Sequence, residues 1–237
     1  MKMSSPSDNF VNIPISIRNL DRWIVRSSIL EAMRGVLPSL SGSLVDIGCG
    51  KMPYRELILA ESGVREYVGV DIEGAREYSR SVKPDVVWDG RSLPLSAQRF
   101  DCALATEVFE HTGDLSGLLS EIRRVLRPGG LLFFTTPFVW PYHEVPHDHQ
   151  RWTSFGLRSK LEAAGFKHVE VRSVGGWHST LAQMLGLWVS RAPMSRPLRY
   201  ALRYPVLATQ RLLVRHDCAA VDVESSMPRL LTGTART

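Results

Sequence analysis

The chain has 237 residues, of which 44% are hydrophobic and 22% charged, and a formal net charge of +5 at pH 7. This length suits one globular domain with a substantial core, and the composition excludes a disordered or fibrous chain. The small basic surplus is spread over the whole chain, which argues against a nucleic-acid partner because such a partner usually requires a concentrated basic patch.

The cysteines and the N-terminus bear on location. Cys49, Cys102 and Cys218 are widely spaced and form no C-x-x-C pair, which argues against disulfides or a thiolate zinc site. The first residues, MKMSSPSDNFVNIP, contain no apolar run typical of a signal peptide. The longest apolar run, residues 131–140, is shorter than the ~18 residues that a membrane span needs. We therefore expect a cytoplasmic protein.

The order of predicted elements defines the fold class. After an irregular segment (1–16), apolar residues recur every three or four positions from Ile17 to Leu37, which predicts an amphipathic helix ended by Pro38. Strands then alternate with helices, which predicts an α/β fold with a doubly wound, mostly parallel sheet. The strands are expected at 44–47, 67–70, 86–88, 102–106, 131–136, 168–174 and 229–234, and the helices at 53–62, 115–126 and 154–164.

The segment 181–215 differs in character from the rest. It mixes apolar residues with six arginines and contains no acid. It fits either a helical insertion that packs on the sheet edge or covers the site, or a surface that contacts anionic lipid. We divide the chain into an N-terminal segment and helix (1–42), a ligand-binding core (43–180), and this insertion with the final strand (181–237), all in one domain.

The first predicted strand runs into a glycine turn, SLVDIGCGKMPY, at residues 43–54. Gly48 and Gly50 allow a ligand to lie against backbone. A dinucleotide fingerprint needs a third glycine at position 53, where this chain has Pro53. Asp46 before the turn would repel a pyrophosphate but suits a cationic ligand, and S-adenosylmethionine carries an ammonium and a sulfonium without phosphate.

Two further acids follow the next strands. Asp71 ends the second strand, 21 residues after Gly50, which is typical of an acid that accepts hydrogen bonds from ribose hydroxyls. Asp89 follows the third strand. It either accepts from an adenine amino group or makes an Asp-Gly turn.

Together, LVDIGCGKMPYREL, YVGVDIEG, RFDCALATEVFEHT and EIRRVLRPGGLLFFTTP resemble the small class I S-adenosylmethionine-dependent methyltransferases over residues 43–175. The resemblance implies a seven-stranded sheet with one antiparallel strand near its edge. It also implies that the glycine turn contacts the methionine part of the donor, Asp71 its ribose and Asp89 its adenine, while Glu107 flanks the methyl group. The expected donor-binding residues are Asp46, Gly48, Cys49, Gly50, Asp71, Ile72, Asp89, Gly90 and Glu107.

A histidine-rich loop, PFVWPYHEVPHDHQRWT, follows the fifth strand. A sugar hydroxyl is a poor nucleophile and requires a base or a metal ion to remove its proton. His143 or His147 is the candidate base, because an imidazole titrates near pH ~6.5. The loop and the glycine turn also resemble a bacterial subgroup of methyltransferases from surface-glycan and natural-product pathways, which favours a saccharide, glycolipid or other small-molecule hydroxyl as acceptor.

A metal is the alternative explanation for the histidines. Glu107, Glu110 and His111 form an E-x-x-E-H pattern that resembles the magnesium site of quinone-precursor and small-RNA 2′-O-methyltransferases. The latter also carry a later H-D-H followed by W-T, as in HDHQRWT here. The implied ligands of Mg²⁺ are Glu107, Glu110, His111 and His147. The same E-H pair is also common in methyltransferases without a metal.

Two other classes of protein are also compatible with the sequence. An NAD-dependent epimerase or reductase usually has a Tyr-x-x-x-Lys pair, and no tyrosine of this chain is followed four residues later by lysine. A non-catalytic protein that retains the fold is the other. The oligomeric state is not predicted.

Overall fold

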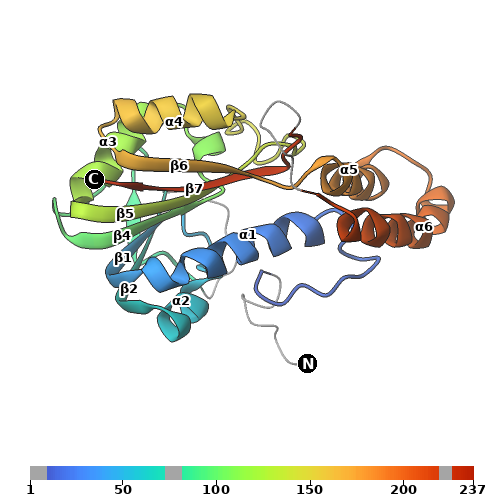
Figure 1. The fold of residues 1–237 in the computed structure, drawn as a ribbon, viewed down its shortest axis with the longest axis horizontal. Coiled ribbons are helices and arrows are strands. Elements are labelled where there is room, and N and C mark those ends of the chain that lie inside the picture. The colour runs from blue at the N-terminus through green and yellow to red at the C-terminus, as the bar shows by residue number, and fades with distance from the viewer. Residues whose placement is uncertain (1–9, 73–81, 219–225) are drawn as a thin grey trace.

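The computed structural model describes residues 10–72, 82–218 and 226–237. A single seven-stranded sheet organises them, in the order β3-β2-β1-β4-β5-β7-β6 (Figure 1). The strands are β1 (Ser41–Ile47), β2 (Gly63–Ile72), β3 (Val86–Trp88), β4 (Phe100–Thr106), β5 (Leu126–Pro137), β6 (Lys167–Val174) and β7 (Leu230–Arg236). Only β7 pairs antiparallel with its neighbours, β5 and β6. The predicted doubly wound, mostly parallel α/β sheet with one antiparallel strand is confirmed.

The helices cover both faces of the sheet. In Figure 1, α1 and α2 lie on one face, α3 and α4 lie on the other, and α5 and α6 extend beyond one end of the sheet. The helices are α1 (Trp23–Val36), α2 (Arg55–Glu61), α3 (Leu115–Val125), α4 (Ser154–Ala163), α5 (Trp177–Arg191) and α6 (Arg196–Arg215), with short 3-10 turns η2 (Leu37–Ser39) and η3 (Phe109–His111).

Successive residues of the central strands supply two separate cores. Leu44 of β1 belongs to the core with α1 and α2, whereas its neighbour Val45 belongs to the core with α3 and α4. This follows from the alternation of side chains along a strand, and a parallel strand covered on both faces is apolar at nearly every position. The run Leu44, Val45 and Ile47 is fully buried for this reason.

Several boundaries differ from the sequence prediction. Strands β2 and β5 begin at Gly63 and Leu126 instead of at residues 67 and 131. The first helix begins at Trp23 instead of Ile17, because the preceding residues form turns in which the Asn19 side-chain amide donates to the Pro14 carbonyl at 2.9 Å. The basic segment, predicted as helical, is two helices joined at residues 192–195. Residues 1–9, part of the segment predicted to be irregular, lie outside the described residues.

Topology places six strand ends at one edge of the sheet. Strands β1 to β5 run parallel, and β6 runs parallel to β5 because both are antiparallel to β7. The chain proceeds from β1 to β2 and β3 on one side, then to β4 and β5 on the other, so the switch point lies between β1 and β4. Ligands of such sheets bind beyond the strand ends at this point.

Candidate active site

The loops after β1 and β4 touch each other at the switch point. Gly48 has a φ of +65°, a backbone conformation that residues other than glycine rarely adopt. A Cβ at this position would lie 2.7 Å from Val108 Cγ2, in the loop after β4. The glycine of the turn is therefore required by close packing of the two loops as well as by its backbone conformation.

Asp71 fixes the glycine turn from the neighbouring strand. Its Oδ2 accepts from the Gly50 N–H at 2.8 Å, and its Oδ1 accepts from the Ile72 N–H at 2.8 Å. Burial raises the pKa of Asp71, while these two hydrogen bonds oppose the rise. The N–H of Cys49 donates to the Val70 carbonyl at 3.0 Å. The turn after β1 and the end of β2 thus form one unit, and the predicted contact of Asp71 with ribose hydroxyls stays a prediction.

Asp46 lies inside the protein, at 2% exposure. Its Oδ2 accepts a hydrogen bond from the Tyr67 hydroxyl, and its Oδ1 has no hydrogen-bond partner. Burial raises the pKa of Asp46 to about 7, so near neutral pH it is not the fully ionised carboxylate that the sequence prediction assumed. The Asp46 carboxyl therefore repels a pyrophosphate less strongly than the sequence prediction assumed. Its unpartnered Oδ1 is the stronger indication that a ligand binds here.

Asp89 is fully exposed and organises a turn. Its Oδ1 accepts from the N–H groups of Arg91 at 2.8 Å and Ser92 at 3.1 Å, and Gly90 follows with a φ of +81°. Of the two interpretations of Asp89, the structure shows the turn. A contact with adenine stays a prediction.

Two glutamates follow β4 in very different settings. Glu107 is half-buried, has a φ of +55°, and accepts from the Thr135 hydroxyl at 2.9 Å. Burial raises the pKa of Glu107 to about 7. Positive φ at a residue other than glycine is a strained conformation that clusters at functional sites.

Glu110 is completely buried, at 0% exposure. Its Oε2 accepts from the Thr136 hydroxyl at 3.3 Å, while its Oε1 has no hydrogen-bond partner. Burial, with a smaller contribution from nearby Glu107, raises the pKa of Glu110 well above its ordinary value. An unpartnered buried oxygen is costly, and in a native protein it commonly marks a place for a water, an ion or a ligand.

The unpartnered oxygen of Glu110 lies beside two imidazoles. One donor atom each from Glu110, His111 and His143 lie within 4.8 Å of one another. The His111 Nε2 is 3.7 Å from Glu110 Oε1, and the rings of His111 and His143 meet edge to face at 4.6 Å between centroids. We call these three residues the Glu–His–His cluster.

The histidine-rich loop (138–153) rests on η3 and orients this cluster. The His149 N–H donates to the Glu110 carbonyl at 2.9 Å, and His111 Nδ1 lies 2.9 Å from the His147 carbonyl. With Nδ1 engaged in this way, His111 presents Nε2 to the cluster. The loop is thus tied to the segment after β4, which the sequence placed 36 residues away from His147.

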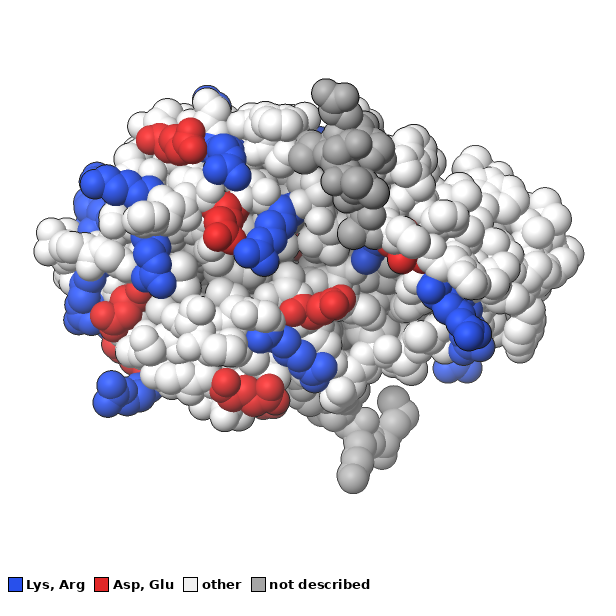
Figure 2. Space-filling view, viewed as in Figure 1, with Lys and Arg blue, Asp and Glu red and all other residues white. Residues whose placement is uncertain are grey.

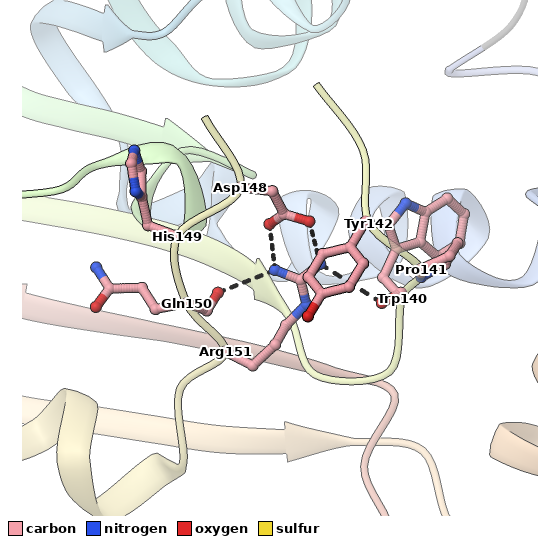
Figure 3. Close-up of a pocket in the computed structure, with 7 residues that line it drawn as sticks. All are labelled: Trp140, Pro141, Tyr142, Asp148, His149, Gln150 and Arg151. Atoms are coloured by element: carbon pink, nitrogen blue, oxygen red, sulfur yellow. Dashed lines mark hydrogen bonds and ion pairs between the residues drawn. The ribbon is translucent and has the colours of Figure 1, made fainter. Parts of the chain in front are cut away.

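The same loop lines an open cleft of about 370 Å³ (Figure 3). Figure 3 shows the Arg151 guanidinium turned onto Asp148, with its contacts to the Gln150 and Trp140 carbonyls also drawn. Asp148 in turn accepts from the His143 N–H at 3.1 Å, and its Oδ2 lies 3.3 Å from His143 Nδ1. The lining residues are Trp140, Pro141, Tyr142, Asp148, His149, Gln150 and Arg151.

The contacts of Asp148 and His143 shift the pKa values of both groups. The hydrogen bond from Arg151 holds the pKa of Asp148 well below its usual range. Burial and the neighbouring His111 lower the pKa of His143, while Asp148 opposes them. At neutral pH, His143 is therefore a neutral imidazole beside a fixed carboxylate.

The structure separates the predicted histidines. His143 is in the cluster, whereas the side chain of His147 is exposed and only its carbonyl reaches His111. Of the predicted magnesium ligands, Glu110 and His111 come together, but Glu107 and the His147 ring lie outside the group whose donors share 4.8 Å. Sequence reasoning missed Arg151, whose only signal was its position three residues after Asp148.

This fold and this edge of the sheet define a class of protein, the class I methyltransferases. A family model described as a methyltransferase domain matches residues 25–171, more than half of the chain. The chain belongs to this family of S-adenosylmethionine-dependent methyltransferases. The match favours the methyl donor over the NAD alternative.

Individual relatives cover part of the chain. Malonyl-[acyl-carrier protein] O-methyltransferase of Methylococcus capsulatus is 33% identical over 119 residues, covering 47% of this chain and 43% of the relative. Trans-aconitate 2-methyltransferase of Azoarcus sp. is 30% identical over 157 residues, covering 62% of this chain and 60% of the relative. The chain thus spans less than two thirds of either relative's length.

Solved structures agree on the fold. An S-adenosylmethionine-dependent methyltransferase from Archaeoglobus fulgidus has a TM-score of 0.56 at 16% identity and covers 98% of this chain and 97% of its own. The [4+2]-cyclase SpnF has a TM-score of 0.56 at 19% identity, with 91% and 83% covered. Identities this low carry the fold and not the reaction.

Proposed function

We propose that this protein transfers a methyl group from S-adenosylmethionine to a hydroxyl oxygen of a saccharide, a glycolipid or another small molecule. The family supports the donor, and the relatives act on several different acceptors by name, so the acceptor must be argued from the site. The observation that carries the hydroxyl acceptor is His143, a neutral imidazole beside Asp148, above the strand ends where the donor binds in this fold.

The first-strand turn suits the donor. Asp46 Oδ1 is buried without a partner and would accept from the ammonium of the donor's methionine part. The turn at Gly48 and Gly50 would lie along the same part, with Cys49 and Ile72 contributing backbone and Asp71 accepting from ribose hydroxyls. When bound, the donor supplies a methyl group on a positively charged sulfur, a good leaving group, so the protein's main task is alignment.

His143 would take the proton of the acceptor hydroxyl. The Asp148 carboxylate, held by Arg151, lies beside the ring and would stabilise the imidazolium that results. Glu107, at the end of β4, would flank the reacting carbon. Trp140 and Tyr142 line the cleft and offer ring surfaces on which a sugar or another flat apolar face packs.

Labelled methyl transfer over a panel of glycans, glycolipids and phenolic or carboxylic small molecules tests this proposal. We expect incorporation into one hydroxyl acceptor, and a loss of about 10²- to 10⁴-fold in kcat for His143→Ala. The matched control, His147→Ala, removes an exposed ring from the same loop and should leave kcat within about threefold, since only its backbone reaches the site. Equal losses in both variants, or transfer only to amines, would contradict the assignment.

A second candidate is metal-assisted transfer, and the unpartnered Oε1 of Glu110 favours it. The Glu–His–His cluster offers one carboxylate and two imidazoles. Mg²⁺ prefers oxygen ligands, so these donors fit it poorly and fit Mn²⁺, Fe²⁺, Co²⁺ or Zn²⁺ better. A divalent ion bound there would supply Lewis-acid chemistry that lowers the pKa of an acceptor hydroxyl.

A chelator separates the two mechanisms. If dialysis against EDTA leaves transfer unchanged, His143 acts as a base without a metal. If EDTA abolishes transfer and Mn²⁺ or Zn²⁺ restores it, the metal mechanism holds and Glu110→Gln should abolish the restoration. Methylation of the 3′ end of a short RNA under these conditions would replace the saccharide acceptor by a ribose 2′-hydroxyl.

A further inference from the structure

Helix α5 exposes a row of large apolar side chains. Leu181, Met184 and Trp188 are 49%, 49% and 48% exposed, and Trp177 is exposed at the start of the helix. The spacing of four, three and four residues places them on one face of the helix. The opposite face is used for packing, with Ala182, Gln183, Gly186 and Val189 buried.

Helix α6, which packs against α5, exposes further large apolar residues. Its exposed residues include Leu198, Tyr200, Tyr204 and Leu212, at 50% to 69% exposure. Figure 1 shows α5 and α6 beyond the end of the sheet, and Figure 2 shows that end of the molecule as largely free of charge, with blue side chains at its lower border. We call the exposed residues of the two helices the α5–α6 surface.

The charged side chains of the segment that carries this surface have one sign. Residues 171–216 contain no aspartate or glutamate, while arginines stand at 191, 196, 199, 203, 211 and 215. Arg196, Arg211 and Arg215 are exposed and form no ion pair with any other described residue. A partner for this surface must therefore be both apolar and anionic.

The α5–α6 surface adjoins the candidate active site. Helix α5 follows β6, whose end lies at the same edge of the sheet as the donor turn. At the far end of α5, the Arg191 guanidinium lies 5.0 Å from the ring centroid of Trp140 and pairs with Asp21 at 3.1 Å. Trp140 lines the cleft, so the last turn of α5 touches the wall of the acceptor site.

We propose that the α5–α6 surface binds the face of an anionic lipid bilayer. No helix among the described residues is long and apolar enough to cross a membrane. An amphipathic face with aromatic and apolar residues, bordered by arginines, instead suits insertion at the headgroup level, with the arginines on anionic lipid. A second copy of this chain is a poorer partner, because a two-fold contact would place the same unpaired arginines against each other without an acid.

Membrane contact at this place would hold the cleft beside the bilayer. An acceptor carried on a lipid could then reach the loop wall at Trp140 without leaving the membrane. Membrane binding by this surface does not require that acceptor, and it can be tested independently of the proposed methyl transfer.

Flotation of the full chain with vesicles, in the absence of methyl donor, tests the inference. The vesicles are phosphatidylcholine alone or phosphatidylcholine with 30% phosphatidylglycerol, at low and at 0.5 M salt. We expect the protein to float with the anionic vesicles at low salt, and to be released from them by salt or by omission of phosphatidylglycerol. The double variant Leu181→Ser/Trp188→Ser and the triple variant Arg196→Gln/Arg211→Gln/Arg215→Gln should each lower the partition coefficient by about tenfold or more.

Matched controls come from surfaces far from α5 and α6. Phe155→Ser on α4 removes an aromatic side chain that is 68% exposed, and Arg34→Gln/Arg65→Gln/Arg123→Gln removes the same charge from other elements. Both should bind vesicles like the wild type. Calorimetric titration with S-adenosylmethionine checks that every variant is folded. Absence of vesicle binding by the wild type, equal binding to neutral vesicles, or equal losses in the controls would overturn the proposal, as would a dimer that the double variant converts to a monomer.

Discussion

The substitution Asp46→Asn tests whether burial raises the pKa of the Asp46 carboxyl at the donor turn. Asp46 is 2% exposed, and burial raises its pKa from the ordinary 3.8 to about 7. The folded state therefore holds this proton more tightly than the unfolded chain does. The stabilisation that results is complete below pH ~4 and is lost as the pH rises through about 7.

The magnitude follows from the two pKa values. Each pH unit between 3.8 and about 7 is worth about 1.4 kcal/mol, so the wild type loses about 4 kcal/mol from this group between pH 4 and pH 8. Asparagine does not ionise, and its amide oxygen can still accept from the Tyr67 hydroxyl. Its amide nitrogen, at the unpartnered Oδ1 position, costs about 1–3 kcal/mol at every pH. The variant should be less stable than the wild type at pH 4.5 and more stable at pH 8.

Urea unfolding of both proteins, followed by circular dichroism between pH 4.5 and pH 8, measures this crossover. Asp101→Asn provides a control of opposite sign, because the hydrogen bonds of Asp101 with Ser43 and Arg127 lower its pKa. Its destabilising effect should grow as the pH rises from 3 to 5. Parallel pH profiles for Asp46→Asn and wild type would refute the inferred burial and protonation of Asp46.

Three further predictions concern the site. Gly48→Ala should lower the free energy of unfolding by about 2 kcal/mol, because the new Cβ would lie 2.7 Å from Val108 Cγ2 in a backbone with positive φ. In urea titrations, the same substitution combined with Val108→Ala should recover part of this loss. Asp71→Ala should weaken S-adenosylmethionine binding about tenfold or more by calorimetry, because it removes the carboxylate that holds the Gly50 N–H at the glycine turn. The acidic limb of the pH profile of kcat/KM should lie below pH 6.5, because burial lowers the pKa of His143, and His143→Ala should remove this limb.

The sequence by itself determined the architecture. Apolar segments of strand length alternate with helical ones, and this pattern has few solutions other than a doubly wound sheet because each strand must be covered on both faces. The glycine turn and Asp71 were also predictable as a unit, since parallel strand ends meet at one edge. These features depend on local chemistry and on the order of elements, both of which can be read along the chain.

Only the tertiary structure decided which side chains share an environment. Sequence could not show that Asp46 lies under the Tyr67 hydroxyl and is half-protonated near neutral pH, because its pKa depends on burial from all sides. Nor could it show that the ring of His143, and not that of His147, meets His111, because both are residues of the same type in one loop. That difference depends on how the loop folds back onto η3, where a backbone carbonyl of one histidine and the ring of the other meet His111.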